Sequence, residues 1–390
     1  MGAVKLGYFQ ENIDPKNFPI QTNTGEFGKY VKHSIYSSVL SCSDGEKRAL
    51  VICIEVRCID PVFTQQIMPP LVEATGVPEE NIVIYCTHNH SSPDSGSTEG
   101  QGVQEWIETV AVPATVKAAV SAIADEQEIT GMFAGSAPTK YLTFVRRYLL
   151  ENGQWSGIAT GKPPVPRVAH ETQADEELRA IRITRKAGKD IVLVNFQTHA
   201  AGACTQEPGA VTGDFVSALR TRLVGYTDAN VMYVQGYCGN TNYNTLLDAE
   251  KPFKKQHFWE VGEALADASA EALKNAKEIS LGKLGFIHKT ITGYINHTQS
   301  HLYPKIYEID EYSDTHGCTA DDRDRMFQEI GLLNRYEGYA LYFRSEKGKT
   351  AELDIATLAI GDFAMAFCPM EMFDVMGMQL RAASPYAMTF

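Results

Sequence analysis

The chain has 390 residues, with 48 acidic and 35 basic side chains and a formal net charge of −13. This balance argues against a nucleic-acid-binding protein, which needs a basic surface to displace counterions from phosphate. It also argues against docking on anionic membranes through a polybasic face. The hydrophobic fraction of 44% is ordinary for a globular protein, and a chain of this length can bury about three quarters of its unfolded surface. We expect residues 1–390 to form a single domain.

The expected location follows from features that the sequence lacks. The N-terminal segment has no continuous apolar core of the length of a signal peptide, and no run of 18 apolar residues predicts a membrane span. The eight cysteines never form a C-x-x-C pair and are scattered through apolar runs, which is typical of reduced thiols. These features predict a cytoplasmic protein that does not bind membranes. A homo-oligomer is compatible with them.

Strand and helix patterns alternate along the chain. In chain order we expect a strand at Ala49–Val56, a helix at Pro61–Gly76, a strand at Asn81–Cys86, a long amphipathic helix at Glu105–Ile129, strands at Leu178–Thr184 and Ile191–Phe196, a helix at Phe215–Val224 capped by Asp214, a strand at Asn230–Gln235, a helix at His257–Lys277, and strands at Leu281–Thr292, Ala351–Ala359 and Asp362–Cys368. The acidic segment Glu308–Asp324 is expected to be a solvated loop leading into a helix.

The order of these elements predicts the fold class. The short turn Lys186–Asp190 indicates a hairpin, so the strands on either side of it should run antiparallel. Strands alternating with helices elsewhere favour an α/β fold. Together they predict mixed β-sheets flanked by helices.

Three of the apolar strands end in polar clusters. These clusters are Thr87–Pro93, Gln197–Gly202 and Gly236–Asn242. Ligands of α/β proteins bind beyond the carboxyl ends of strands. We therefore expect the three clusters to converge on one crevice.

Histidines are the most informative members of these clusters. His88 and His90 follow the same strand, and His199 follows another. In an extended segment the rings of a His-x-His pair point to one side, because side chains alternate with period two. Neutral imidazole is the commonest metal ligand, although a hydrogen-bonded loop pair is the other interpretation. Glu371, just after an apolar strand and a proline, is either a further ligand or a helix-start residue.

These residues resemble motifs of a known family. The signature T-H-T-H-S-G-P appears as Thr87–Pro93, and N-F-x-x-H followed by Gly-Asp appears as Asn195–His199 and Gly213–Asp214. The late segment P-G-E-x-T…G-x-x-L-R appears as Pro369–Phe373 and Gly377–Arg381. In order and spacing the chain resembles the N-terminal catalytic domain of the neutral/alkaline, non-lysosomal ceramidases, which are zinc-dependent amidases.

The resemblance implies a zinc ion held by His88, His199 and Glu371. His90 would lie beside the ion as the proton shuttle that protonates the leaving nitrogen. In the family a tyrosine further along completes the site, and no segment up to Phe390 matches it. The fourth ligand is therefore left open.

Other residues are expected to contact the substrate. Arg146 resembles an arginine near the family's pocket and could clamp a carboxylate or carbonyl; a surface arginine is the alternative. The loop from Gly236 to Gly239 could aim backbone N–H groups at the oxyanion, with Asn240 and Asn242 adding side-chain donors.

One departure from the family bears on the substrate. The family's amidase box G-D-V-S-P-N aligns with Gly239–Asn244, so that Asn242 replaces the serine associated with ceramide cleavage and no proline follows. The chain also lacks a match to the immunoglobulin-like domain and the secretion signal of true ceramidases. A small soluble molecule is therefore expected as substrate rather than long-chain ceramide.

The sequence thus predicts a zinc-dependent hydrolase that cleaves an amide bond with zinc-activated water. An ester or lactone hydrolase would use the same site. A cysteine hydrolase based on Cys204 or Cys238 is a rival enzyme, although a thiol near zinc would tend to bind the ion. The rival from another class is a non-catalytic binding protein on a decayed hydrolase scaffold.

Overall fold

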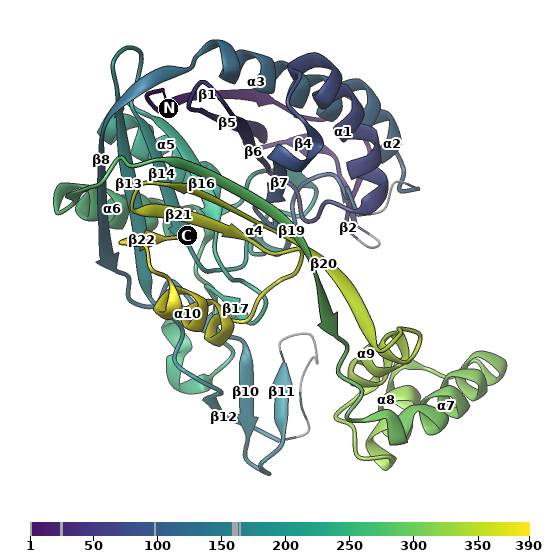
Figure 1. The fold of residues 1–390 in the computed structure, drawn as a ribbon. Helices are drawn as coiled ribbons and strands as arrows, with labels where there is room; N and C mark the ends of the chain where they lie inside the picture. The colour runs from purple at the N-terminus through teal and green to yellow at the C-terminus, as the bar shows by residue number, and fades with distance from the viewer. Residues whose placement is uncertain (1, 24–25, 97–98, 158–162, 164) are drawn as a thin grey trace.

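A computed structural model describes residues 2–390 except 24–25, 97–98, 158–162 and 164 (Figure 1). The described strands include a nine-stranded mixed sheet with the order β16-β14-β13-β8-β1-β5-β6-β7, to which β18 is added beside β8. Their bounds are β1 Lys5–Asn12, β5 Tyr36–Ser43, β6 Arg48–Ile54, β7 Ile82–Cys86, β8 Gln127–Pro138, β13 Glu177–Arg185, β14 Ile191–Phe196, β16 Asn230–Gln235 and β18 Lys277–Ile279. The predicted hairpin β13–β14 is antiparallel, whereas β14–β16 and β6–β7 are parallel. The prediction of a mixed α/β fold is confirmed.

The nine-stranded sheet consists of two halves that pack face to face. Only Lys5 and Leu6 of β1 pair with β8, so the sheet can fold over at this short link. One hydrophobic cluster then contains residues of both halves, among them Val51 of β6 and Leu193 of β14. Their chain neighbours Ile52 and Val194 lie in two other clusters, on the outer faces. Both faces of these strands are buried, which explains why they are continuous apolar runs rather than alternating ones.

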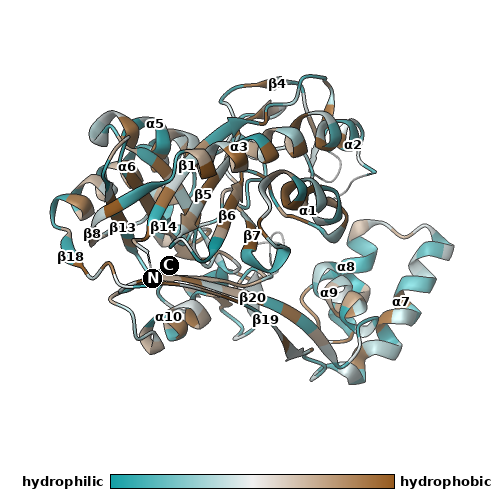
Figure 2. Cartoon of the chain, turned by 45° about the horizontal axis from the view of Figure 1, so that its top comes forward, coloured by the Kyte–Doolittle hydropathy of each residue, from teal (hydrophilic) through white to brown (hydrophobic). Residues whose placement is uncertain are grey.

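Helices cover the two outer faces. On one half lie α1 (Pro61–Thr75) and the helix formed by α2 (Val103–Trp106), the π-helical η2 (Ile107–Ala111) and α3 (Val112–Ala124). On the other half lie α5 (Phe215–Thr227) and α6 (Phe258–Lys274). The outcome is a four-layer arrangement of helices, sheet, sheet and helices, with hydrophobic residues toward the interior (Figure 2).

Three predictions about helices need correction. The long helix ends at Ala124 rather than Ile129, and α6 ends at Lys274 rather than Lys277. The residues after them form strands β8 and β18, which pair with each other. Pairing with a neighbouring strand overrides the local helical pattern. The third correction concerns the expected absence of any segment apolar enough to span a membrane. The helix of residues 103–124 has the length and the mean hydropathy (1.4) to cross one, and it is the only such helix in the described part of the chain. Scattered polar residues had concealed it, and in this fold α3 packs against α1, β1 and β5.

A second sheet extends from the body as an arm. Its order is β19 (Leu284–Tyr294), β20 (Thr350–Ile360), β21 (Phe363–Phe367) and β22 (Met388–Thr389). The outer ends of β19 and β20 carry three helices, α7 (Tyr303–His316), α8 (Ala320–Glu329) and α9 (Arg335–Ser345), around a small core of their own. The acidic segment predicted as a loop therefore lies mostly in α7 and α8. Ile309 of this segment, together with the flanking Ile306 and Phe327, is buried in that core.

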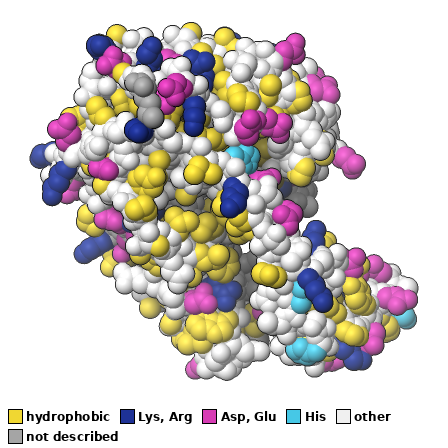
Figure 3. Space-filling view, in the orientation of Figure 1, with side chains coloured by type: hydrophobic (Ala, Val, Ile, Leu, Met, Phe, Trp, Pro, Cys, Tyr) yellow, Lys and Arg dark blue, Asp and Glu magenta, His cyan; other side chains and the backbone are white. Residues whose placement is uncertain are grey.

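The remaining described elements are short. They are β2 Ile20–Asn23, β3 Glu26–Gly28, β4 Tyr30–Val31, η1 Glu79–Asn81, β9 Phe144–Val145, β10 Arg147–Leu150, β11 Trp155–Gly157, β12 Arg167–His170, α4 Ala203–Gln206, β15 Ala210–Val211, β17 Thr241–Asn242, η4 Asp248–Phe253, η5 Ser300–Leu302 and α10 Asp374–Ala383. The sheet β11-β10-β12 projects beside the helical unit, and Figure 3 shows a hollow between the two with hydrophobic side chains on the side of the body.

Candidate metal centre

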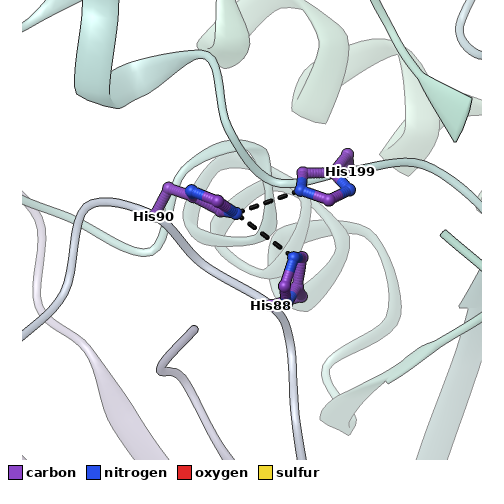
Figure 4. A group of neighbouring side chains, drawn as sticks. All are labelled: His88, His90 and His199. Atoms are coloured by element: carbon purple, nitrogen blue, oxygen red, sulfur yellow. Dashed lines mark hydrogen bonds between the residues drawn. The ribbon is translucent and has the colours of Figure 1, made fainter. Parts of the chain in front are cut away.

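Three histidines from two distant parts of the chain meet at one point. His88 and His90 follow β7, and His199 follows β14. These strands belong to different halves of the large sheet, and the packing of the halves brings their ends together; the Tyr85 hydroxyl of β7 donates to the Tyr233 carbonyl of β16 across the interface at 2.8 Å. The Nε2 atom of His90 lies 3.2 Å from that of His88 and 3.0 Å from that of His199 (Figure 4).

The other ring nitrogens show which way the imidazole lone pairs point. His88 Nδ1 lies 2.7 Å from the Arg57 carbonyl oxygen, and His199 Nδ1 lies 3.1 Å from the Cys238 carbonyl oxygen. A carbonyl only accepts, so both Nδ1 atoms carry the proton and both Nε2 atoms present a lone pair to the shared point. The three imidazoles therefore converge as in a metal site, and His88 and His199, whose lone pairs are directed by backbone carbonyls, are the ligand candidates among them.

The backbone around His88 differs from the predicted extended segment. His88 has φ = 57°, in the left-handed region that few residues other than glycine adopt. Strand alternation is therefore not what turns the two rings together. The loop is held by the buried Asn89 side chain, which donates to the Thr212 carbonyl at 2.7 Å, and by the His90 N–H, which donates to the Ala200 carbonyl at 3.0 Å. The second bond ties the two histidine loops to each other.

All three imidazoles are neutral near pH 7. Burial lowers the pKa of His90 to about 3, with a further contribution from His88. Burial also lowers the pKa of His199 well below its ordinary value, followed by the effect of the Arg146 charge. Burial lowers the pKa of His88, against the opposing effect of Glu371. Neutral imidazole is the form that binds a metal ion.

Glu371 and Arg146 lie at the edge of the histidine group. Glu371 Oε1 is 3.4 Å from His88 Nε2, and Glu371 Oε2 is 3.8 Å from the Arg146 guanidinium. Glu371 precedes α10 by three residues and is not part of that helix. The mostly buried Arg146 side chain also donates to the Gly239 carbonyl at 2.9 Å. The structure thus brings five predicted site residues together: His88, His90, His199, Glu371 and Arg146.

The predicted oxyanion loop is arranged differently. The Gly236 N–H donates to the Phe196 carbonyl, and the Gly239 N–H donates to the Met372 carbonyl, so neither points a free donor at the histidines. Asn240 is buried and exchanges two hydrogen bonds with Asp374 at the start of α10. Asn242 lies in β17, where its side-chain oxygen accepts the Asn244 N–H. The Gly239 N–H and the Asn240 side chain are therefore used to attach this loop to the segment that leads into α10.

Two further residues support the site: Arg57, which sequence reasoning missed, and Cys238, which it considered only as a nucleophile or a thiol near zinc. Arg57 orients His88 through its carbonyl and pairs with the buried Asp94 at 2.7 Å. Cys238 orients His199 through its carbonyl, and its thiol is grouped with His199 and Glu371. Carbonyl groups that accept the Nδ1 proton in this way set the tautomer and the ring orientation of metal-binding histidines. Arg57 directly follows the predicted strand Ala49–Val56, and that position was the available signal.

The two cysteines considered as nucleophiles lack the partner that this role needs. The Cys204 thiol donates to the Ala201 carbonyl, and burial raises its pKa to about 11. Burial also raises the pKa of Cys238. Among the described residues neither thiol is hydrogen-bonded to a histidine, so neither is activated as in a cysteine hydrolase.

A cavity of about 630 Å³ is lined by His88, Cys238 and Glu371 of the candidate site. It follows β7 from His88 to the arm, where His288 and Asp354 line it. Most of its wall is apolar, and its charged lining residues include Arg57 and the ligand candidate Glu371. Of the residues predicted to contact substrate, Gly236 lines this cavity. Its size and mixed lining are typical of small-molecule sites.

Comparison with known proteins supports the fold alone. No family model matches the sequence, and no curated protein matches it. Among solved structures, the neutral ceramidase from Pseudomonas aeruginosa is similar, with a TM-score of 0.68 and 15% identity over 100% of this chain and 67% of that chain. A structure described as ceramidase complexed with C2 is also similar, with a TM-score of 0.66 and 14% identity over 100% of this chain and 68% of that one. The chain therefore has a ceramidase-like fold.

Proposed function

We propose that this chain is a zinc-dependent hydrolase that cleaves an amide bond in a small soluble substrate. The observation that carries the proposal is the convergence of three imidazole Nε2 atoms, two of them with their lone pairs directed by backbone carbonyls, next to one carboxylate. The similarity of the fold to that of ceramidases, which cleave an amide, favours this bond type. The eight cysteines are free thiols, which supports the proposed cytoplasmic location.

The donor set fits zinc. Imidazole nitrogen and carboxylate oxygen are its usual ligands, and three protein ligands with an open position are typical of catalytic sites. Without a cation, the lone pairs of His88 and His199 would both face His90, whose Nε2 can donate one proton to only one of them. When bound, zinc supplies a Lewis acid and a nucleophile derived from water at neutral pH.

Residues of the chain perform the remaining steps. In our proposal His90 moves the proton, because among the described residues its Nδ1 atom has no hydrogen-bond partner and its ring is less firmly held than those of His88 and His199. A group at hydrogen-bond distance from the reacting atoms can transfer a proton to the leaving nitrogen. Arg146, with one N–H committed to Gly239, has further N–H groups to orient a substrate carbonyl or carboxylate.

The substrate is proposed to be small. A cavity of about 630 Å³ matches the usual range for small-molecule sites. Asn242 takes the place of the serine that the family resemblance associates with ceramide cleavage, and its side chain is engaged within its own turn. Both observations favour a substrate other than a long-chain lipid amide.

Metal content and hydrolysis, measured together, test the proposal. The purified protein should contain about one zinc per chain, hydrolyse members of a panel of small N-acyl amides, lose activity with a chelator and regain it with Zn²⁺. Hydrolysis of only esters or lactones would assign the site to that alternative chemistry. Activity that survives full metal removal would overturn the zinc mechanism. Protein that contains no zinc after purification without chelator would support the non-catalytic binding protein on a decayed scaffold.

A further inference from the structure

Cys238 belongs to a group of possible metal ligands next to the three histidines. One donor atom each of His199, Cys238 and Glu371 lie within 4.8 Å of one another. Glu371 is in turn 3.4 Å from His88, and both outer histidines approach His90. Cys238 and Glu371 therefore adjoin the three histidines, and His199 belongs to both groups. The Cys238 side chain is buried, and the residue lines the same cavity.

The close approach of two segments explains this position. The Gly239 N–H donates to the Met372 carbonyl at 3.0 Å, so the segment after β16 runs against the segment that carries Glu371. A Cβ atom at Gly239 would lie 2.3 Å from the Glu371 carbonyl oxygen, so only glycine permits this packing. The Cys238 carbonyl also accepts the Nδ1 proton of His199. The thiol is thereby placed between an imidazole and a carboxylate.

We propose that Cys238 is a thiolate ligand of the metal ion, an inference that rests on the metal centre of the proposed function. On binding, the S–H bond breaks, an S–metal bond forms and the proton passes to solvent. Thiolate and the Glu371 carboxylate together balance the charge of a divalent cation. The thiolate is a soft ligand, unlike imidazole and carboxylate. Its presence favours thiophilic ions such as Zn²⁺ and Cd²⁺ over Mn²⁺ or Mg²⁺.

Cobalt substitution tests this assignment directly. Titration of the metal-free protein with Co²⁺ should give visible ligand-field bands and a near-ultraviolet thiolate-to-cobalt charge-transfer band. Both should reach their maximum at one Co²⁺ per chain. Cys238→Ser should lose the charge-transfer band while keeping ligand-field bands. Cys204→Ser is the matched control, because half-buried Cys204 follows His199 by five residues but its thiol is paired with the Ala201 carbonyl. This control should keep both sets of bands.

The outcomes separate the inference from the function on which it rests. Wild-type protein that binds one Co²⁺ without a charge-transfer band would overturn the Cys238 assignment and leave the metal centre intact. Protein that binds no Co²⁺ or Zn²⁺ would overturn the proposed function as well. Because the band is measured on the wild-type protein, the test does not depend on the folding of the variant. As a second measurement, the Cd²⁺-to-Zn²⁺ affinity ratio of Cys238→Ser should fall by at least about 10-fold.

Discussion

Acidification should destabilise the metal-free protein through His90. An unfolded histidine has a pKa near 6.5, whereas burial lowers the pKa of His90 to about 3. Between these values the unfolded state binds a proton that the folded state does not, so stability falls as the pH falls. With about 1.36 kcal/mol for each pKa unit, His90 alone lowers the free energy of unfolding by about 2 kcal/mol between pH 7 and pH 5. The loss is fully developed only below pH 3.

A comparison with His90→Asn isolates this contribution. Urea denaturation of chelator-treated protein, followed by circular dichroism at pH 7 and pH 5, gives the stability difference between wild type and variant at each pH. We expect this difference to shift by about 2 kcal/mol in favour of the variant at pH 5. His316→Asn, at an exposed position on α7, controls for the loss of a histidine elsewhere. If the difference in the free energy of unfolding between wild type and His90→Asn does not change with pH, His90 is not a buried neutral histidine.

Three further substitutions test the roles of single residues. His199→Ala should lose both zinc and activity, whereas His90→Ala should keep zinc and turn over about 10²- to 10⁴-fold more slowly; an active, zinc-loaded His199→Ala protein would contradict the ligand assignment. Asn240→Ala should lower the free energy of unfolding by about 2–3 kcal/mol, since it removes two buried hydrogen bonds at the start of α10, and should also weaken zinc binding; unchanged denaturation and zinc affinity would disprove this anchoring role. Arg146→Lys should keep zinc but lower kcat/KM about 10-fold or more, because a lysine cannot reproduce the planar donors that hold the Gly239 carbonyl and the substrate together; kinetics equal to wild type would exclude Arg146 from the site.

Local pattern was a reliable guide where burial was uniform along an element. The runs that end at Cys86, Phe196 and Gln235 are strands within one residue of the predicted bounds, and Asp214 caps α5 through its side chain as expected. Prediction was wrong where two patterns compete. The residues after Ala124 continue a helix-like pattern, but pairing with β13 makes them a strand, and that partner lies about 50 residues away in the chain.

The candidate site shows the same division. Residue type identified His88, His90 and His199 as possible ligands, because imidazoles at strand ends are unusual in an otherwise apolar sequence. Residue type did not show that the Asn240 side chain would be hydrogen-bonded to Asp374, nor that Cys238 would lie beside His199 and Glu371. Both relations depend on α10 packing against the loop after β16, and this contact joins segments more than 130 residues apart.

The sequence by itself determined several of the central strands and helices, the mixed α/β class and the histidines able to bind a metal. Only the tertiary structure decided how these side chains meet. β7 and β14 lie near opposite edges of the strand order, and their ends are neighbours because the sheet folds over at a two-residue link and buries its inner face. The burial of apolar area that drives this folding is non-directional. Hydrophobic patterning therefore predicts that the strands are buried, whereas the geometry of the site depends on which strands pack against each other.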